Sequence, residues 1–124
     1  MIKTIGILLL WLFALSVPAS ASRSCHVPFI HTPNNQTVRG TMFVVAGKRC
    51  SISLRRSLGP IYNTHLVAGA RNGRVSVNGY RVTYVSRPGY VGEDHFVYAR
   101  EGLSTRNQPI TRTVEVTVKV AERW

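Results

Sequence analysis

The chain has 124 residues, of which 16 are lysine or arginine and only 5 are aspartate or glutamate, so its formal net charge at pH 7 is +11. A chain of this length forms one domain around one hydrophobic core and leaves no room for a second. The strong positive charge favours anionic partners. The shortage of acids argues against functions that need clustered carboxylates, such as calcium binding.

Residues 1–21 have the pattern of a secretory signal peptide. Lys3 supplies the early positive charge, residues 5–17 form an apolar run, and Ala19-Ser20-Ala21 matches a signal-peptidase site. A helix of that run spans about 20 Å, short of the roughly 30 Å hydrocarbon core of a bilayer. We therefore expect cleavage after Ala21, no membrane span in the mature chain, and a periplasmic or secreted protein.

Two cysteines, Cys25 and Cys50, remain after cleavage. An exported chain meets an oxidising compartment, and an even cysteine count favours a disulfide. The sequence has no Cys-x-x-Cys motif, and two cysteines alone cannot complete a zinc site. We therefore predict a Cys25–Cys50 disulfide that ties the N-terminal arm to the rest of the domain.

The mature chain divides into an irregular arm, residues 22–36, and a β domain, residues 37–122. Two prolines and an Asn-Asn pair interrupt the arm. In the β domain, residues 41–45 and 50–54 have strand patterns separated by a turn at 46–49, which predicts an antiparallel hairpin. A weaker strand pattern covers residues 61–67.

Asn72-Gly73 and Asn78-Gly79 are the strongest hairpin signals in the chain. Asparagine and glycine tolerate the positive φ that tight hairpin turns demand. We therefore expect a strand over residues 74–77 between two turns, and a further strand over residues 80–85.

The C-terminal third predicts two more strands, over residues 95–100 and 111–120, with a turn at Glu101-Gly102 between them. In the last strand the alternating Val114, Val116, Val118 and Val120 are expected to face the core. The polar face is expected to carry Arg112, Glu115, Thr117 and Lys119. About seven short strands at spacings near ten residues predict an all-β, antiparallel sandwich.

The segment from Gly89 to Tyr98 carries the most specific motif. Phe96 and Tyr98 share one strand face and are expected to fill the core, while Gly89 and Gly92 allow backbone geometry closed to other residues. We expect Asp94 to accept backbone N–H bonds from the tight turn at Gly92. This role would be structural, not catalytic.

Residues 73–120 resemble the Ig-like, cadherin-like domains of bacterial surface and envelope proteins. The resemblance is carried by Gly-Tyr-Val-Gly-Glu-Asp-His-Phe-Val-Tyr at residues 89–98 and, more loosely, by residues 84–88. It implies an Ig-like sandwich and a place in the cell envelope. Calcium-binding relatives have aspartate-rich loops, whereas Asp94 is the only aspartate here, so no metal or other cofactor is expected.

Catalytic motifs are not found in the sequence. Asp94 and His95 are adjacent, so a strand would point them to opposite faces and prevent a base–orienter pair. No Gly-x-Ser-x-Gly motif is present. We therefore expect a protein that is not an enzyme. One alternative is a metal-binding protein using His26 and His31 of the arm, with other histidines nearby in space.

The arginines carry the main functional hypothesis. Arg74, Arg81 and Arg87 could gather around one hairpin, with Tyr80 and Tyr90 stacked between them, and arginine offers a planar fork to phosphate or carboxylate. We predict a non-catalytic exported binding or structural module that docks on an anionic envelope component or a protein partner. Export argues against nucleic acid, and no run of basic residues exceeds two.

Two other interpretations of the basic surface stay open. One is an inhibitor or accessory subunit that presents a loop or an edge strand to an envelope enzyme or complex. The other is a surface whose charge only keeps the protein soluble. Nothing in the sequence specifies an oligomeric state.

Overall fold

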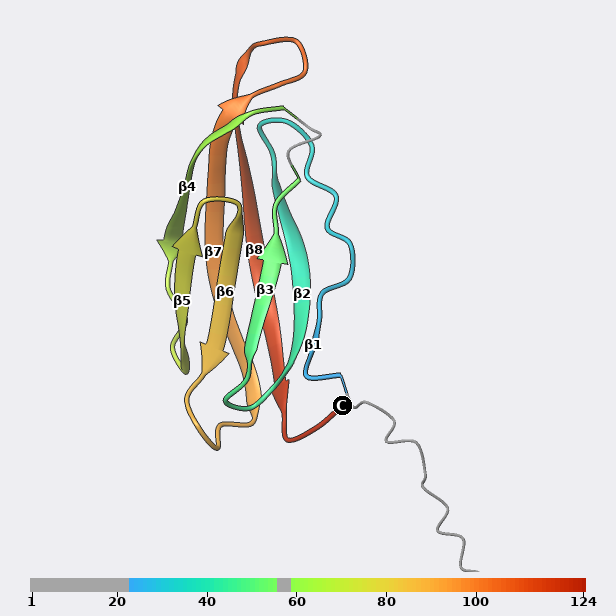
Figure 1. Ribbon diagram of the computed structural model, residues 1–124, viewed down its shortest axis with the longest axis vertical. Coiled ribbons are helices and arrows are strands. Elements are labelled where there is room, and N and C mark those ends of the chain that lie inside the picture. The colour runs from blue at the N-terminus through green and yellow to red at the C-terminus, as the bar shows by residue number, and fades with distance from the viewer. Residues whose placement is uncertain (1–22, 56–58) are drawn as a thin grey trace, which may run out of the picture.

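The computed structural model describes residues 23–55 and 59–124, so the signal peptide predicted for residues 1–21 lies outside the described residues. The described chain is all-β, with eight strands in two sheets. Figure 1 shows the smaller sheet lying across one face of the larger, as expected of a sandwich. Within residues 23–55 and 59–124, no helix could span a membrane.

The strands of the larger sheet are, in spatial order, β1 (Cys25–His26), β2 (Thr37–Val45), β8 (Pro109–Ala121), β7 (Gly92–Leu103) and β4 (Ile61–Ala68). Those of the smaller sheet are β3 (Arg49–Ser53), β6 (Arg81–Ser86) and β5 (Gly73–Asn78). The arm is irregular as predicted, except that two of its residues form β1. This short strand raises the count from about seven to eight.

The core lies between the two sheets, and the predicted alternation accounts for it. Phe96 and Tyr98 of β7 are buried, and so are the four alternate valines of β8. The smaller sheet contributes Tyr84, whose ring stacks on Phe96 with centroids 6.0 Å apart. Fully burying a large apolar side chain stabilises the fold by about 1.5–3 kcal/mol, so this aromatic cluster is a main source of stability.

Arg112 lies on the other face of the last strand from the one predicted. The side chain is buried, with only 6% of its surface exposed, on the same face as Val114. Side chains two apart on a strand share a face, so Arg112 follows the valines and not Glu115. The charge of arginine favoured the polar face, but the two-residue period of the strand determines which face the side chain occupies.

The hairpin predicted for residues 41–54 is wrong, because its strands belong to different sheets. β2 pairs with β1 and β8, whereas β3 pairs with β6. Residues 46–48 therefore carry the chain from one sheet to the other. Met42 of β2 and Ile52 of β3 are both buried in the same core. The alternation identifies the buried faces but does not distinguish a hairpin from a crossing between sheets.

The larger sheet is mixed, which differs from the antiparallel sandwich predicted. β2 and β8 pair in parallel, in continuous register from Thr37 with Thr113 to Val45 with Ala121. The remaining pairs are antiparallel. Because β2 forms no hairpin with β3, one of its edges pairs with the final strand of the chain.

The predicted turn at Glu101-Gly102 is also wrong, because β7 continues through both residues. A Cβ at position 102 would lie 1.9 Å from the carbonyl oxygen of Pro60. Glycine here permits a close backbone approach, not a turn. The chain reverses at residues 104–108, where the buried Ser104 hydroxyl accepts two backbone N–H bonds.

Of the two predicted Asn-Gly hairpins, one is confirmed with a shift of one residue. β5 and β6 pair up to Asn78 with Arg81, so the loop is Gly79-Tyr80. Gly79 has a φ of 60°, as a two-residue hairpin loop requires at its first position. The Asn72-Gly73 hairpin is wrong, because that segment connects β4 of the larger sheet to β5 of the smaller.

The predicted disulfide between Cys25 and Cys50 is confirmed. It joins β1 of the larger sheet to β3 of the smaller one. The bond therefore fixes the start of the arm and closes one side of the sandwich at the same point.

Removing the disulfide, by reduction or in a Cys25→Ala/Cys50→Ala variant, is expected to lower the free energy of unfolding by about 3–4 kcal/mol. The cause is the conformational entropy that the unfolded chain regains when a loop of about 26 residues opens. Urea unfolding of both forms at equal pH measures this loss. Equal midpoints for the oxidised and cysteine-free proteins would contradict it.

Candidate functional site

The outer face of the smaller sheet is a regular grid of polar side chains. β3, β6 and β5 each point alternate residues outward, and the register sets them in three rows. These rows are Arg49, Val85 and Arg74; then Ser51, Thr83 and Ser76; then Ser53, Arg81 and Asn78. The hydroxyls of Ser51 and Thr83 are hydrogen-bonded at 2.8 Å in the middle row.

This grid and the segments beside it form an open hollow of about 1090 Å³. We call it the arginine hollow, after the five arginines that line it: Arg49, Arg71, Arg74, Arg81 and Arg87. The fold thus brings together the three arginines predicted to form a binding site. Two further arginines of the hollow were missed by that prediction.

Arg49 and Arg71 were missed for different reasons. Arg49 begins a period-two strand on its polar face, a signal visible in the sequence, but its neighbours become known only when β3 pairs with β6. Arg71 lies in the crossing between the sheets, in the segment predicted to be a hairpin turn. Its position depends on contacts with residues more than twenty positions away.

Acidic side chains are absent from the lining of the hollow among the described residues. Glu115 lies near Arg39, with 3.9 Å between charged atoms, and Glu93 lies near His95. Both pairs are outside the hollow. Its five guanidinium groups therefore have no carboxylate among them, and their field favours an anion.

Asp94 holds one wall of the hollow in place from inside the protein. Its buried carboxylate accepts hydrogen bonds from the backbone N–H groups of Arg71 at 3.0 Å and Asn72 at 2.9 Å, and from the Tyr84 hydroxyl at 2.8 Å. The backbone N–H of the adjacent His95 donates a fourth hydrogen bond to the same carboxylate. The predicted bonding to the turn at Gly92 is wrong, because the turn that Asp94 fixes is residues 71–72.

The hydrogen bonds keep Asp94 ionised despite its burial. Burial by itself raises the pKa of the carboxyl, but donation from the Tyr84 hydroxyl and three backbone N–H groups outweighs it. The pKa of Asp94 is therefore below its ordinary value. Burial, followed by the bond to Asp94, raises the pKa of Tyr84, so this phenol stays a donor.

The two glycines of the motif adopt the backbone geometry expected of them. Gly89 and Gly92 have φ values of 79° and 144°, which other residues rarely adopt. They shape the connection between β6 and β7, on which Tyr90 lies. Tyr90 donates its hydroxyl hydrogen to the carbonyl of Glu93, which braces this connection.

The two tyrosines predicted to stack among the arginines lie outside the hollow. Tyr90 contacts one of them, with the guanidinium carbon of Arg87 5.4 Å from its ring centroid. Tyr80 lies in the β5–β6 loop, at the opposite end of β6 from Arg87. Of the predicted interleaving with Arg74, Arg81 and Arg87, the described residues thus show the contact between Arg87 and Tyr90 at the rim.

The histidines of the metal-binding alternative are dispersed. His26 stacks on Phe43, His31 lies beside Phe29, and His95 is near Thr117. Within residues 23–55 and 59–124, no group of three or more histidine, cysteine, aspartate or glutamate side chains is placed to hold a metal ion.

The chain matches no protein-family model, and no curated protein is significantly similar to it. Five guanidinium groups spread over a rigid sheet can donate pairs of charge-assisted hydrogen bonds to phosphate or carboxylate oxygens.

Replacing Asp94 by Asn is expected to lower the free energy of unfolding by about 3 kcal/mol at pH 7, since an amide N–H₂ then faces buried donors. The wild-type carboxyl has a lowered folded pKa, so its contribution is present above the ordinary pKa near 4 and is lost as the pH falls through the folded value. Measured by urea unfolding, the loss in free energy of unfolding between pH 7 and pH 3 should be smaller in the variant than in wild type.

A Glu115→Gln variant is the matched control, because it removes one exposed carboxylate from the same sheet. Its stability should stay within about 0.5 kcal/mol of wild type. If Asp94→Asn and wild type lose the same stability between pH 7 and pH 3, the network is not what keeps the Asp94 pKa low.

Proposed function

We propose that this protein is a non-catalytic, exported binding module that docks on an anionic component of the bacterial cell envelope through the arginine hollow. The observation that carries the proposal is the convergence of five arginines, from the three strands of the grid and two flanking positions, with no described acidic side chain between them. Docking would rest on long-range attraction followed by paired hydrogen bonds to phosphate or carboxylate groups.

We further propose that the protein is exported from the cytoplasm. The signal-peptide pattern of residues 1–21 supports it, and so does the disulfide, since such bonds persist in oxidising compartments. The partner would then be an envelope lipid, an acidic polysaccharide or an acidic protein, all of which present oxyanions to a cationic surface.

We also propose that the domain is of the Ig-like kind. In Ig domains the strands B, E and D form one sheet and C, F and G the other. The order β3, β6 and β5 here corresponds to the first set, and β4, β7 and β8 to the second. The resemblance of residues 89–98 to Ig-like, cadherin-like envelope domains supports the same assignment.

The arginine hollow is tested by co-sedimentation with vesicles that contain phosphatidylglycerol, a probe of anionic surfaces. Replacing Arg74, Arg81 and Arg87 together by Gln is expected to weaken binding about a hundredfold, at about 1 kcal/mol per arginine near such a surface. Wild-type binding should fall steeply with added salt and should be absent with neutral phosphatidylcholine vesicles.

The matched control replaces Arg39, Arg106 and Arg123 by Gln, which removes the same charge outside the arginine hollow. This triple variant should retain most of the binding. If both triple variants lose binding equally, the basic surface acts only through its total charge and the hollow is not the site. Wild-type binding to a protein from envelope extract that resists 0.5 M salt would instead favour the inhibitor or accessory-subunit function.

A further inference from the structure

A pair of buried arginines ends the inner face of the larger sheet. Arg100 of β7 and Arg112 of β8 lie directly opposite each other in the ladder, and their exposed fractions are 5% and 6%. Burial, together with the charge of Arg112, lowers the pKa of Arg100, and burial lowers the pKa of Arg112. Burying two like charges side by side is costly without a counter-charge.

The described chain supplies neutral acceptors to this pair but no carboxylate. Arg100 donates from Nη1 to the backbone carbonyl of Arg55 at 2.9 Å, and Arg112 donates from Nη2 to the side-chain oxygen of Asn34. The Nη2 atom of Arg100 is buried with no hydrogen-bond partner among the described residues. A buried guanidinium nitrogen without an acceptor is rare in native proteins.

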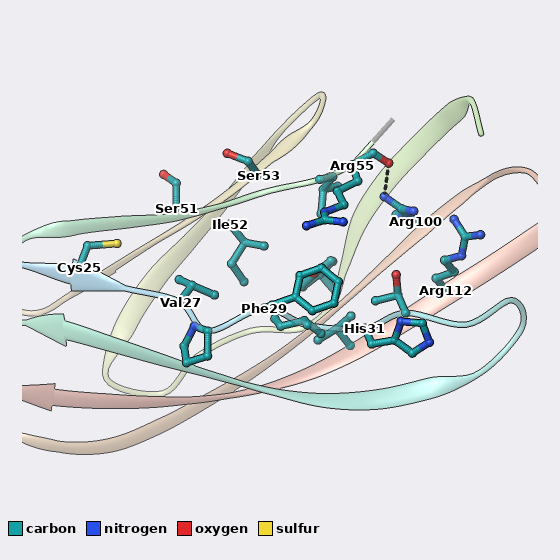
Figure 2. A pocket seen from close by; sticks show the side chains of 16 residues that line it. Cys25, Val27, Phe29, His31, Ser51, Ile52, Ser53, Arg55, Arg100 and Arg112 are labelled. Atoms are coloured by element: carbon teal, nitrogen blue, oxygen red, sulfur yellow. Dashed lines mark hydrogen bonds between the residues drawn. The ribbon is translucent and has the colours of Figure 1, made fainter. Parts of the chain in front are cut away.

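Both arginines line a cavity of about 610 Å³ between the sheets. Figure 2 shows their guanidinium groups side by side at one end, while Val27 and Ile52 lie between them and Cys25. The rest of the lining is largely apolar and includes Ile30, Leu54, Tyr98 and Val114. The cavity thus has a cationic end and an apolar body.

The N-terminal arm forms one wall of this cavity and is fixed at both ends. The disulfide anchors its start, and the bond from Arg112 to Asn34 holds its other end. Between them, Ile30 lies directly over Gly40 of β2. The guanidinium carbon of Arg55 is 4.3 Å from the ring centroid of Phe29, at the cationic end of the cavity (Figure 2).

We propose that this cavity binds a small amphipathic anion, with a carboxylate or phosphate head on Arg100 and Arg112 and a short aliphatic body along the apolar walls. Adjacent guanidinium groups offer paired donors to oxyanions, and charge pairing is stronger in a buried site. The head would supply the counter-charge that the described chain lacks. This site lies on the inner side of the smaller sheet, whereas the arginine hollow lies on its outer side. Ligand binding in the cavity does not depend on the function proposed for the arginine hollow.

The proposal is tested by NMR titration of the wild-type protein with decanoate, decyl phosphate, decanol and inorganic phosphate. The two amphipathic anions should bind and shift the Nε–H signals of Arg100 and Arg112. Decanol and inorganic phosphate should each bind at least tenfold more weakly, because each lacks one half of the ligand. Equal affinity for either control compound, or no shift at the two arginines, overturns the proposal.

An Arg100→Gln variant tests the contribution of the charge. It should weaken decanoate binding about tenfold to a hundredfold, the range for a lost hydrogen bond to a charged group. Arg106→Gln, at an exposed arginine that lines neither this cavity nor the arginine hollow, is the matched control and should bind decanoate like wild type. Equal decanoate affinity in Arg100→Gln and wild type overturns the proposal.

An Arg100→Met variant separates a ligand-binding role from a structural one. If the buried charge serves a ligand, its removal should leave the unfolding equilibrium constant of the ligand-free protein unchanged or about tenfold smaller, while decanoate binding is lost. A variant that unfolds more readily and still binds decanoate overturns the assignment. Should both Arg100 variants fail to fold, the wild-type titration decides, since it needs no substitution.

Discussion

The arrangement of this domain depends on the carboxylate of Asp94. It lies on the inner face of β7 and is bonded to the backbone of the crossing at Arg71 and Asn72 and to the hydroxyl of Tyr84 on β6. One side chain thereby joins the two sheets and the segment that passes between them. A buried carboxylate without these donors would cost several kcal/mol, so the network forms completely or the fold loses this connection.

The inner face of β7 carries buried charges of opposite sign at its two ends. It carries Asp94 at one end, Phe96 and Tyr98 in the middle, and Arg100 at the other end. The carboxylate is saturated by internal donors, and it is separated from the buried arginines by the aromatic rows. A protein with few acids thus keeps its one buried carboxylate for folding and leaves a buried cationic pair without a carboxylate in the described chain.

The hydrogen bonds of Asp94 also affect the outer face of the smaller sheet, because they fix the crossing that leads into β5. Arg71 is one of the two residues of the crossing that donate to Asp94, and Arg74 follows on β5. Arg87 donates its backbone N–H to the carbonyl of Asn72 at 2.9 Å, which links this further residue of the lining directly to that crossing. Internal hydrogen bonds therefore set the spacing of surface arginines, and an anionic partner would meet a preformed array of donors.

Much of the fold was predictable because strand period and turn chemistry are local. The alternate valines of β8, the pairing of Cys25 with Cys50 and the inward direction of Phe96 and Tyr98 were read from residue order alone. The hairpin of β5 and β6 was predicted to within one residue, because glycine at a tight turn has few substitutes. The buried position of Arg112 follows from the same two-residue period, although its charge led to the opposite prediction.

Partners of strands were not predictable in this way, because they are chosen by contacts between distant residues. A turn of three or four residues can close a hairpin or carry the chain to the opposite sheet, and total burial decides between them. As a result β2 pairs with β8, and Asn72-Gly73 lies in a crossing between the sheets. Gly102 packs closely against the backbone of Pro60. Composition and periodicity determined the all-β class, the disulfide and the faces of most strands. Only tertiary packing brought Arg49 and Arg71 to the arginine hollow and set Arg100 against Arg112, because register between strands depends on the whole core at once.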